Sequence, residues 1–301
     1  MYATTGNFHL SDAVGSATAG KEDGRVSRSR GHSDTTHPPR RTHRARATQQ
    51  LELPNLPHWL YALRRERVWS RELAARNIDI SASYVAKLER AKLVPTTDTL
   101  AKIVEGYRLG PAQRRHTYDL WSPPRSLPTV EDLRRLTATP DRTGHIADLD
   151  SDNVVSVYTT PLSTVLIASD YLHHVLPGLG DAGDNLAIWF FQPAARELVL
   201  DWEREALHVV ASIRAALAPY RASVEARALL RTLAPNPDFN RIWTANPAAV
   251  AYGRRSGTPI QLRTKRSREP ITAIIQITEI SDPHNILVAY GLNHNNAQNC
   301  A

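Results

Sequence analysis

The sequence predicts two folded domains, an all-α domain followed by an α+β domain, with a basic tail in front of them. Three observations support this prediction. Residues 51–121 contain five stretches of helical periodicity, and residues 122–128 are rich in prolines that stop helices. Residues 129–295 combine short β-branched runs with helical stretches. A chain of 301 residues is long enough for about two domains.

The tail covers residues 1–50, which are rich in Gly, Ser, Thr, His and Arg and lack apolar periodicity. Such a segment buries too little apolar surface to offset its ordering entropy, so we expect it to be disordered. Its run Pro38–Ala47 leaves three interpretations open: a basic arm on phosphates, a solvated tail, or an extension from a misassigned start codon. Residues 296–301 are predicted to form a short second tail.

The positive charge is confined to the first part of the chain. Residues 1–125 hold 21 Lys and Arg against 12 Asp and Glu, whereas residues 126–301 hold 16 against 18. A basic module before a near-neutral one is expected when only the first module binds a polyanion; chance in arginine usage is the alternative. The lone cysteine, Cys300, excludes an internal disulfide, which fits a reducing cytoplasm. No run approaches the roughly 18 apolar residues of a membrane span.

The first three predicted helices are defined by periodicity and by capping residues. Leu56, Leu60 and Leu63 lie on one face of the first helix. Ser70 and Ser81 are suitable N-caps for the second and third helices. These two helices, at about 70–77 and 81–89, have the dimensions of a helix-turn-helix.

The last two predicted helices of this domain begin at prolines. The fourth follows Pro95 and turns Leu100 and Ile103 inward. The fifth begins at Pro111 and ends near Trp121. Together the five helices predict a compact all-α module.

In a helix-turn-helix, the second helix projects its N-terminal side chains into the major groove. Serines and lysine can bond to base edges, and arginines and lysines can bond to phosphates. Val85 and Leu88 are expected to face the core of the domain. The predicted base-reading residues are Ser81, Ala82, Ser83 and Lys87, the predicted phosphate-binding residues are Arg64, Arg71, Arg90 and Lys92, and Tyr84 completes the DNA-binding set. The alternative is a helix pair that only packs.

Residues 56–121 resemble the phage-repressor (XRE-like) helix-turn-helix family. The resemblance lies in the pattern Ser-x-x-Tyr-Val-x-x-Leu-Glu from Ser81, followed by Pro95-Thr96 at the family's distance. Asp79 and Ala91 stand where the family usually has glycine. The register of the second helix is open, because counting from Ser70 fits the family and counting from Leu73 leaves one residue too many.

The sequence of the second domain predicts five short strands and three helical stretches. The strand runs are VVSVY, STVLI, TPIQLR, TAIIQIT and NILVAY, in chain order. The helical stretches run from Ala194 to Leu217, from Ser223 to Leu233 and from Asp238 to Val250.

This domain is similar to the MmyB-like ligand-binding domain of bacterial transcription regulators. The similarity spans about 154–291 and lies in Asn-Leu-Ala from Asn185, Pro-Ala-Ala-Arg from Pro193 and Asp-Trp-Glu from Asp201, then in Phe239 and Trp243. It implies a PAS-like fold, an antiparallel sheet with helices across it, and a small apolar ligand. The departures from the family pattern are Trp189, Gln192, Asn246 and Glu269-Pro270.

Six residues near this signature are candidate ligand contacts, because ligand pockets are mostly apolar with a few placed polar groups. They are Asn185, Trp189, Phe190, Trp202, Phe239 and Trp243. The aromatic residues serve equally well as an ordinary core. Catalytic, cofactor and metal sites are not expected: Asp201 and Glu203 do not face each other on a helix, and His173-His174 has no partner at ligand spacing.

The sequence therefore predicts a cytoplasmic, nucleoid-associated transcription regulator that is not an enzyme. It would bind double-stranded DNA as a homodimer and respond to a small apolar effector or partner, with no membrane association. The alternative is a protein-interaction module whose helical domain docks a protein and whose second domain is structural.

Overall fold

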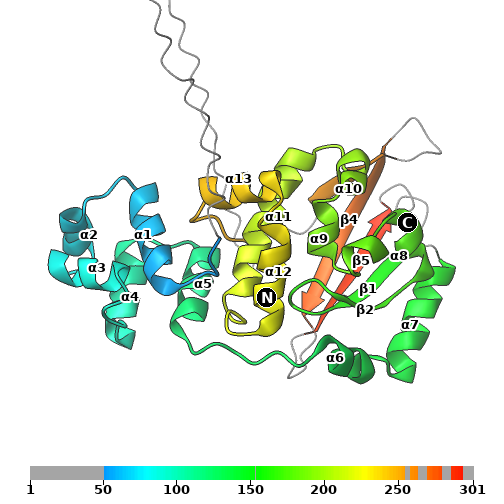
Figure 1. The fold of residues 1–301 in the computed structure, drawn as a ribbon, viewed down its shortest axis with the longest axis horizontal. Helices are drawn as coiled ribbons and strands as arrows, with labels where there is room; N and C mark the ends of the chain where they lie inside the picture. Colours follow the sequence, from blue (N-terminus) through cyan, green and yellow to red (C-terminus); the bar gives the residue numbers. More distant parts are fainter. Residues whose placement is uncertain (1–50, 153, 255–257, 264–269, 280–285, 294–301) are drawn as a thin grey trace, which may run out of the picture. The chain divides into compact units, whose positions relative to one another are not determined.

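The computed structural model of the chain describes residues 51–152, 154–254, 258–263, 270–279 and 286–293 (Figure 1). The two predicted tails, residues 1–50 and 296–301, lie outside the described residues.

The predicted all-α domain contains the five expected helices. Their bounds are α1 Leu56–Glu66, α2 Arg71–Asn77, α3 Ala82–Glu89, α4 Thr97–Gly106 and α5 Pro111–Trp121. The predicted N-caps are present, since the Ser70 hydroxyl accepts a hydrogen bond from the Leu73 amide and the Ser81 hydroxyl accepts one from the Tyr84 amide, each at 3.1 Å. Ser70 is therefore the N-cap of α2, as predicted.

Two residues after the end of each of the helices α1 to α4 lies a residue that has left-handed backbone geometry and is not glycine. The residues are Val68, Asp79, Ala91 and Arg108, with φ angles between 49° and 57°. After α3, the Lys92 amide donates to the Lys87 carbonyl at 2.9 Å, a bond that satisfies a free helix-end carbonyl. The two positions where the family usually has glycine, Asp79 and Ala91, therefore keep the glycine-like conformation without glycine.

Gly106, at the end of α4, is required by a close approach. A Cβ atom at this position would lie 2.4 Å from the Asn77 carbonyl oxygen and 2.5 Å from the Ile78 side chain. The end of α4 therefore packs directly on the end of α2, which holds the helix-turn-helix pair from behind.

The second domain is built on a five-stranded sheet in which every neighbouring pair of strands is antiparallel. The order is β2-β1-β5-β4-β3. The strands are β1 Val155–Thr159, β2 Val165–Ala168, β3 Pro259–Leu262, β4 Ile271–Glu279 and β5 Leu287–Asn293. Each overlaps one of the five predicted runs, with ends that differ by one to three residues.

Helices cover both faces of this sheet (Figure 1). On one face, Tyr158 and Leu166 pack against α6 and α7; on the other, Val157 and Val165 join the large core formed with the later helices. The helices are α6 Val130–Thr137, α7 Pro140–Ser151, α8 Asp170–Val175, α9 Leu186–Phe190, α10 Pro193–Leu198, α11 Trp202–Leu217, α12 Val224–Leu233 and α13 Pro237–Ala245, with a 3-10 turn at Gly180–Ala182.

The single helix predicted from Ala194 to Leu217 is wrong: the chain forms two helices, α10 and α11, with a break between them. At the break, Val199 bridges to Leu262 of β3, and the Leu200 amide donates to the Gln261 carbonyl at 3.0 Å. The edge strand thus takes the hydrogen bonds that a continuous helix would have used, and helical periodicity alone does not reveal this competitor.

The predicted linker, residues 122–128, is bound to the second domain. The Arg125 amide donates to the Pro219 carbonyl at 2.7 Å, and Arg221 donates to the carbonyls of Asp119 and Ser122 at 3.0 and 2.6 Å. These contacts join the end of α5 to the turn after α11. The exact domain boundaries stay predictions.

Candidate DNA-binding surface and ligand cavity

Helix α3 has a polar face and an apolar face. Ser83 and Lys87 are exposed, whereas Val85 and Leu88 are almost fully buried in the core of the first domain. Ser81 is also exposed, but its hydroxyl caps the helix and lies 3.0 Å from the Ser83 hydroxyl. The predicted inward and outward residues are thus separated as expected.

The other predicted DNA contacts are grouped around the same helix. Ala82 and Tyr84 are half-buried in its first turn, and Arg90 and Lys92 are exposed just beyond its last turn. Three side chains that carry positive charge, Lys87, Arg90 and Lys92, therefore lie within six residues of one another on the exposed surface.

Arg64 does not fit the predicted role as a phosphate contact. Its side chain is 7% exposed, and its guanidinium donates to both carboxylate oxygens of Glu89 at 2.5 and 3.0 Å and to the Trp69 carbonyl at 2.8 Å. The hydrogen bond with Glu89 raises the pKa of Arg64, so the guanidinium stays charged. Helical spacing predicted that Arg64 points outward. Its side chain is buried instead, because it pairs with the buried carboxylate of Glu89 at the end of α3.

Arg71 shares the same carboxylate but remains half-exposed. Its Nε donates to Glu89 at 2.9 Å. Glu89 therefore links α1, α2 and α3 through two arginines, and it holds Arg71 at the surface of the helix-turn-helix pair. Of the two arginines, only Arg71 remains a candidate phosphate contact.

The second domain contains a cavity of about 660 Å³ between the sheet and its covering helices. The sheet contributes alternate residues, such as Ala273, Ile275 and Ile277 of β4. Helix α11 contributes Glu205, His208, Val209, Ser212, Ile213 and Ala216 at helical spacing, with Ala215 beside them. A volume of this size suits a small organic molecule, and the lining is mostly apolar.

Only two of the six predicted ligand contacts line the cavity. They are Trp189 and Phe190, both almost fully buried. Asn185 instead caps α9: its side-chain oxygen accepts from the Ala187 and Ile188 amides, and its nitrogen donates to the Leu162 carbonyl. The predicted role of Asn185 is therefore replaced by a structural one.

The remaining three candidates belong to an aromatic core beside the cavity. Phe190 stacks on Trp202 at 5.6 Å, Phe191 meets Phe239 edge-on at 5.3 Å, and Phe239 stacks on Trp243 at 5.4 Å. Trp202, Phe239 and Trp243 do not line the cavity. These three aromatic residues therefore form an ordinary core, which was the alternative to ligand contact. The cavity-lining residues of α11 follow helical spacing, and that spacing is the signal in the sequence that a search by residue type missed.

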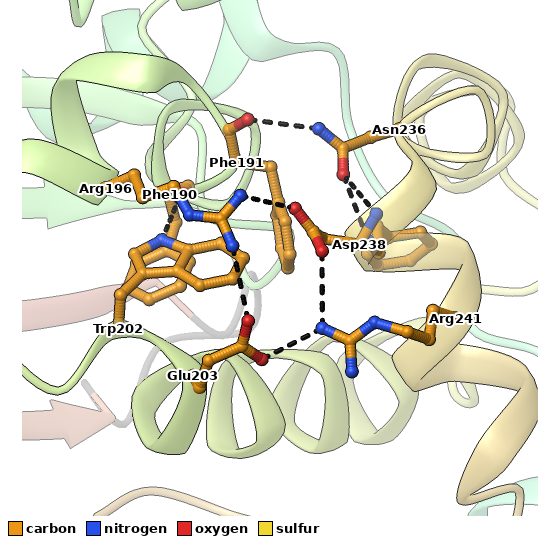
Figure 2. Close-up of polar contacts among 9 residues, drawn as sticks. Phe190, Phe191, Arg196, Trp202, Glu203, Asn236, Asp238 and Arg241 are labelled. Atoms are coloured by element: carbon orange, nitrogen blue, oxygen red, sulfur yellow. Dashed lines mark hydrogen bonds and ion pairs between the residues drawn. The ribbon is translucent and has the colours of Figure 1, made fainter.

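Figure 2 shows a group of charged residues beside this aromatic core: Arg196, Glu203, Asp238 and Arg241. Arg196 lies 4.3 Å over the Trp202 ring and donates to Asp238 at 2.7 Å and Glu203 at 3.2 Å. Arg241 completes the ring of charges by donating to Glu203 at 2.9 Å and Asp238 at 3.2 Å. These charged residues thus connect α10, α11 and α13 beside the aromatic core.

A second charged group lies in the cavity wall itself. Glu205 is buried and accepts hydrogen bonds from Arg254 at 2.5 Å and from Arg204 at 3.3 Å. Burial alone would raise the pKa of Glu205, but the bonds and charges of Arg254 and Arg204 lower it overall. Burial and the charge of Arg254 lower the pKa of the neighbouring His208, and the buried Nε of Arg254 has no hydrogen-bond partner among the described residues.

Two protein families match this chain, one in the region of the DNA-binding surface and one in the region of the cavity. Residues 59–117 match a helix-turn-helix domain family, and residues 157–271 match the MmyB-like transcription regulator ligand binding domain. The chain joins these two domains. It is accordingly a DNA-binding transcription regulator with a ligand-binding domain. Comparison with curated proteins gave no match.

The two matched ranges cover the predicted DNA contacts and part of the cavity lining. The helix-turn-helix match runs from α1 into α5, and the MmyB-like match runs from β1 to the start of β4 and includes all of α11. Within the described residues, no helix has the length and apolar character needed to cross a membrane. The same residues contain no cluster of three or more His, Cys, Asp or Glu placed to hold a metal ion.

Proposed function

We propose that this regulator binds a specific duplex as a homodimer through the polar face of α3, and that a small apolar molecule in the cavity modulates the binding. The observation that carries the proposal is the segregation of α3, whose polar residues Ser83 and Lys87 are exposed while Val85 and Leu88 anchor it to the core. A single short helix reads too few base pairs, so two copies on a palindromic site are expected.

Within this proposal the residues divide by task. Ser81, Ser83 and Lys87 face base edges, with Ala82 and Tyr84 beside them in the first turn. Arg71, Arg90 and Lys92 bind phosphates and supply most of the affinity, since each phosphate contact releases counterions. Their positions around one helix support a single DNA-facing surface.

The DNA part of the proposal is tested by salt titration on a duplex selected from a random library with the wild-type protein. Binding should weaken about tenfold or more between 50 and 200 mM salt if several phosphates are contacted. The double variant Ser83→Ala, Lys87→Ala should lose affinity chiefly for the selected duplex. Lys102→Ala removes the same charge from α4, where Lys102 pairs with Asp79 at 3.0 Å, and is the matched control.

Affinity that does not respond to salt would refute DNA binding and favour docking of a protein on the helical domain. An equal loss on selected and random duplexes would show that Ser83 and Lys87 touch only phosphates.

The ligand part is supported by the size and lining of the cavity. The fluorescent probe 1-anilinonaphthalene-8-sulfonate should bind the full chain with blue-shifted emission. Ala216→Trp, which changes a cavity-lining residue of α11, should reduce that binding several-fold because the new ring occupies the space. Leu207→Trp adds the same ring on the exposed side of α11 and should change nothing. Equal probe binding by both variants would contradict a ligand in this cavity.

Three further features complete the proposal. An antiparallel sheet with helices across it supports the PAS-like description of the second domain. A chromosomal target places the regulator in the cytoplasm, on the nucleoid. Its two domains are of regulatory type, so we assign it no catalytic reaction.

A further inference from the structure

Helix α5 belongs to the helix-turn-helix domain, yet it forms part of the cavity wall. Arg115 and Asp119 of α5 line the cavity together with Tyr252, which follows α13. The Tyr252 hydroxyl donates to the Asp119 carboxylate at 2.6 Å, and the Arg115 guanidinium lies 4.2 Å from the centre of the Tyr252 ring. One aromatic ring therefore contacts both the cavity and two charged residues of the first domain.

The chain around Tyr252 is anchored to the second domain on both sides. Before it, the buried Arg214 of α11 donates to the carbonyls of Trp243, Asn246 and Ala249 at 2.7, 2.9 and 2.6 Å. Burial lowers the pKa of Arg214 to about 10, and three carbonyl acceptors compensate for its lost hydration.

After Tyr252, Arg254 is held by the carboxylate of Glu205 in the cavity wall. Tyr252 is consequently fixed in place between two attachments to the same helix, α11. The bond from the Tyr252 hydroxyl to Asp119 therefore connects the cavity wall at α11 to α5.

From α5, contacts continue to the DNA-binding helix. The ring of His116, fully buried, lies edge-on to Trp59 of α1 at 4.6 Å, and Trp59 donates to Thr117 at 2.8 Å. On the next turns of α1, Arg64 holds Glu89 at the end of α3. A shift of α5 therefore moves α1, and α1 is bonded to the recognition helix.

We propose that Tyr252 couples occupancy of the cavity to the affinity of α3 for DNA, through its bond to Asp119 and its contact with Arg115. This inference rests on the proposed function and names how that function is regulated. A molecule that meets the Tyr252 ring and a duplex that meets α3 each bias the same contact between α5 and Tyr252. By linkage, each then changes the affinity of the other by the same factor.

Tyr171 provides a matched comparison. It also lines the cavity, but it comes from α8 and stacks on His174 at 6.1 Å. Removing its hydroxyl changes the polarity of the cavity wall without removing a bond to α5. The exchange of Tyr for Phe is chemically identical at the two positions.

The test is a double-mutant cycle on the full chain with the selected duplex. Ala216→Trp serves as a covalent substitute for a ligand, since Ala216 is a cavity-lining residue of α11. We expect Ala216→Trp to change the dissociation constant for DNA about fivefold or more, as typical coupling predicts. In a Tyr252→Phe background the same substitution should change it less than about twofold, whereas a Tyr171→Phe background should retain the full effect.

Equal fold-changes in the wild-type and Tyr252→Phe backgrounds would overturn the proposal, as would no change on Ala216→Trp in the wild type. Thermal unfolding confirms that each variant is folded, and Ser212→Phe replaces Ala216→Trp if that variant is not. Wild-type protein without salt-dependent DNA binding would refute the proposed function itself. An additive cycle in a protein that binds DNA refutes only the coupling.

Discussion

Each of the two domains contains an ion-pair network in which two arginines share a glutamate, and the two networks differ in the burial of that glutamate. In the first domain, Arg64 and Arg71 share Glu89, whose side chain is 2% exposed. In the second, Arg196 and Arg241 share Glu203, which is 60% exposed, and Asp238 (Figure 2). The distances between arginine nitrogens and carboxylate oxygens are similar in both networks, so these distances alone do not tell which network contributes more to stability.

Burial decides what each network does. A buried carboxylate without its arginines is an uncompensated charge, so the contacts of Glu89 hold α1, α2 and α3 in one arrangement. Exposed pairs gain little because water and salt screen them. Arg196 contributes instead by covering the Trp202 ring, so its apolar stem and planar charge protect the aromatic core. The buried network fixes the arrangement of α1, α2 and α3, whereas the exposed network covers the Trp202 ring.

The sharpest test of this contrast is Glu89→Ala. Because two arginines lose their buried partner, unfolding free energy should fall by about 3–5 kcal/mol, measured by urea titration with far-ultraviolet circular dichroism. DNA affinity should fall too, since α3 loses its attachment to α1. A loss below about 1 kcal/mol would show that the buried and exposed networks are equivalent.

A second test uses the buried His116, which lies near the same domain's core. Burial, with the charges of Arg214 and Arg221, lowers its pKa to about 3, below the usual value near 6.5. The unfolded chain therefore binds a proton that the folded protein does not, and stability falls as pH drops from about 6.5 towards 3. The slope from this residue is up to about 1.4 kcal/mol per pH unit.

Unfolding free energies at pH 7.5 and pH 5 would measure this effect. His116→Gln should show a smaller loss on acidification than the wild type, whereas His173→Gln, which alters an exposed histidine, should leave the wild-type dependence intact. The same pH dependence in all three proteins would mean that His116 is accessible to protons when folded.

A third test concerns backbone strain behind the recognition helix. Ala91 has a φ angle of +57°, where a Cβ atom is unfavourable. Ala91→Gly should raise stability by about 1 kcal/mol, measured by thermal unfolding. Ala86→Gly, inside α3, should lower it by a similar amount. If Ala91→Gly and Ala86→Gly both lower stability, the left-handed backbone of Ala91 is not a source of strain.

The smallest effect is expected from the exposed network. Glu203→Gln removes the negative charge that Arg196 and Arg241 share. The unfolding free energy should nevertheless change by less than about 1 kcal/mol, and by even less at high salt. A loss comparable with that of Glu89→Ala would require the network in Figure 2 to be stronger than its exposure allows.

Much of the fold could be predicted because the relevant signals are local. Helix caps at Ser70 and Ser81, prolines at the starts of later helices and β-branched runs all act within a few residues. The five helices of the first domain and the five strands of the second were therefore predicted from the chain itself. The break between α10 and α11 was not, because the competing hydrogen bonds come from β3, sixty residues later.

The sites divide in the same way. The sequence by itself determined the two domains and the inward and outward faces of α3, because periodicity decides which side of a helix is apolar. Only the tertiary structure decided that Arg64 is buried, that Trp202 belongs to a core beside the cavity, and that α5 forms part of the cavity wall. These depend on residues far apart in the chain, whose charges, volumes and hydrogen bonds become neighbours only after folding.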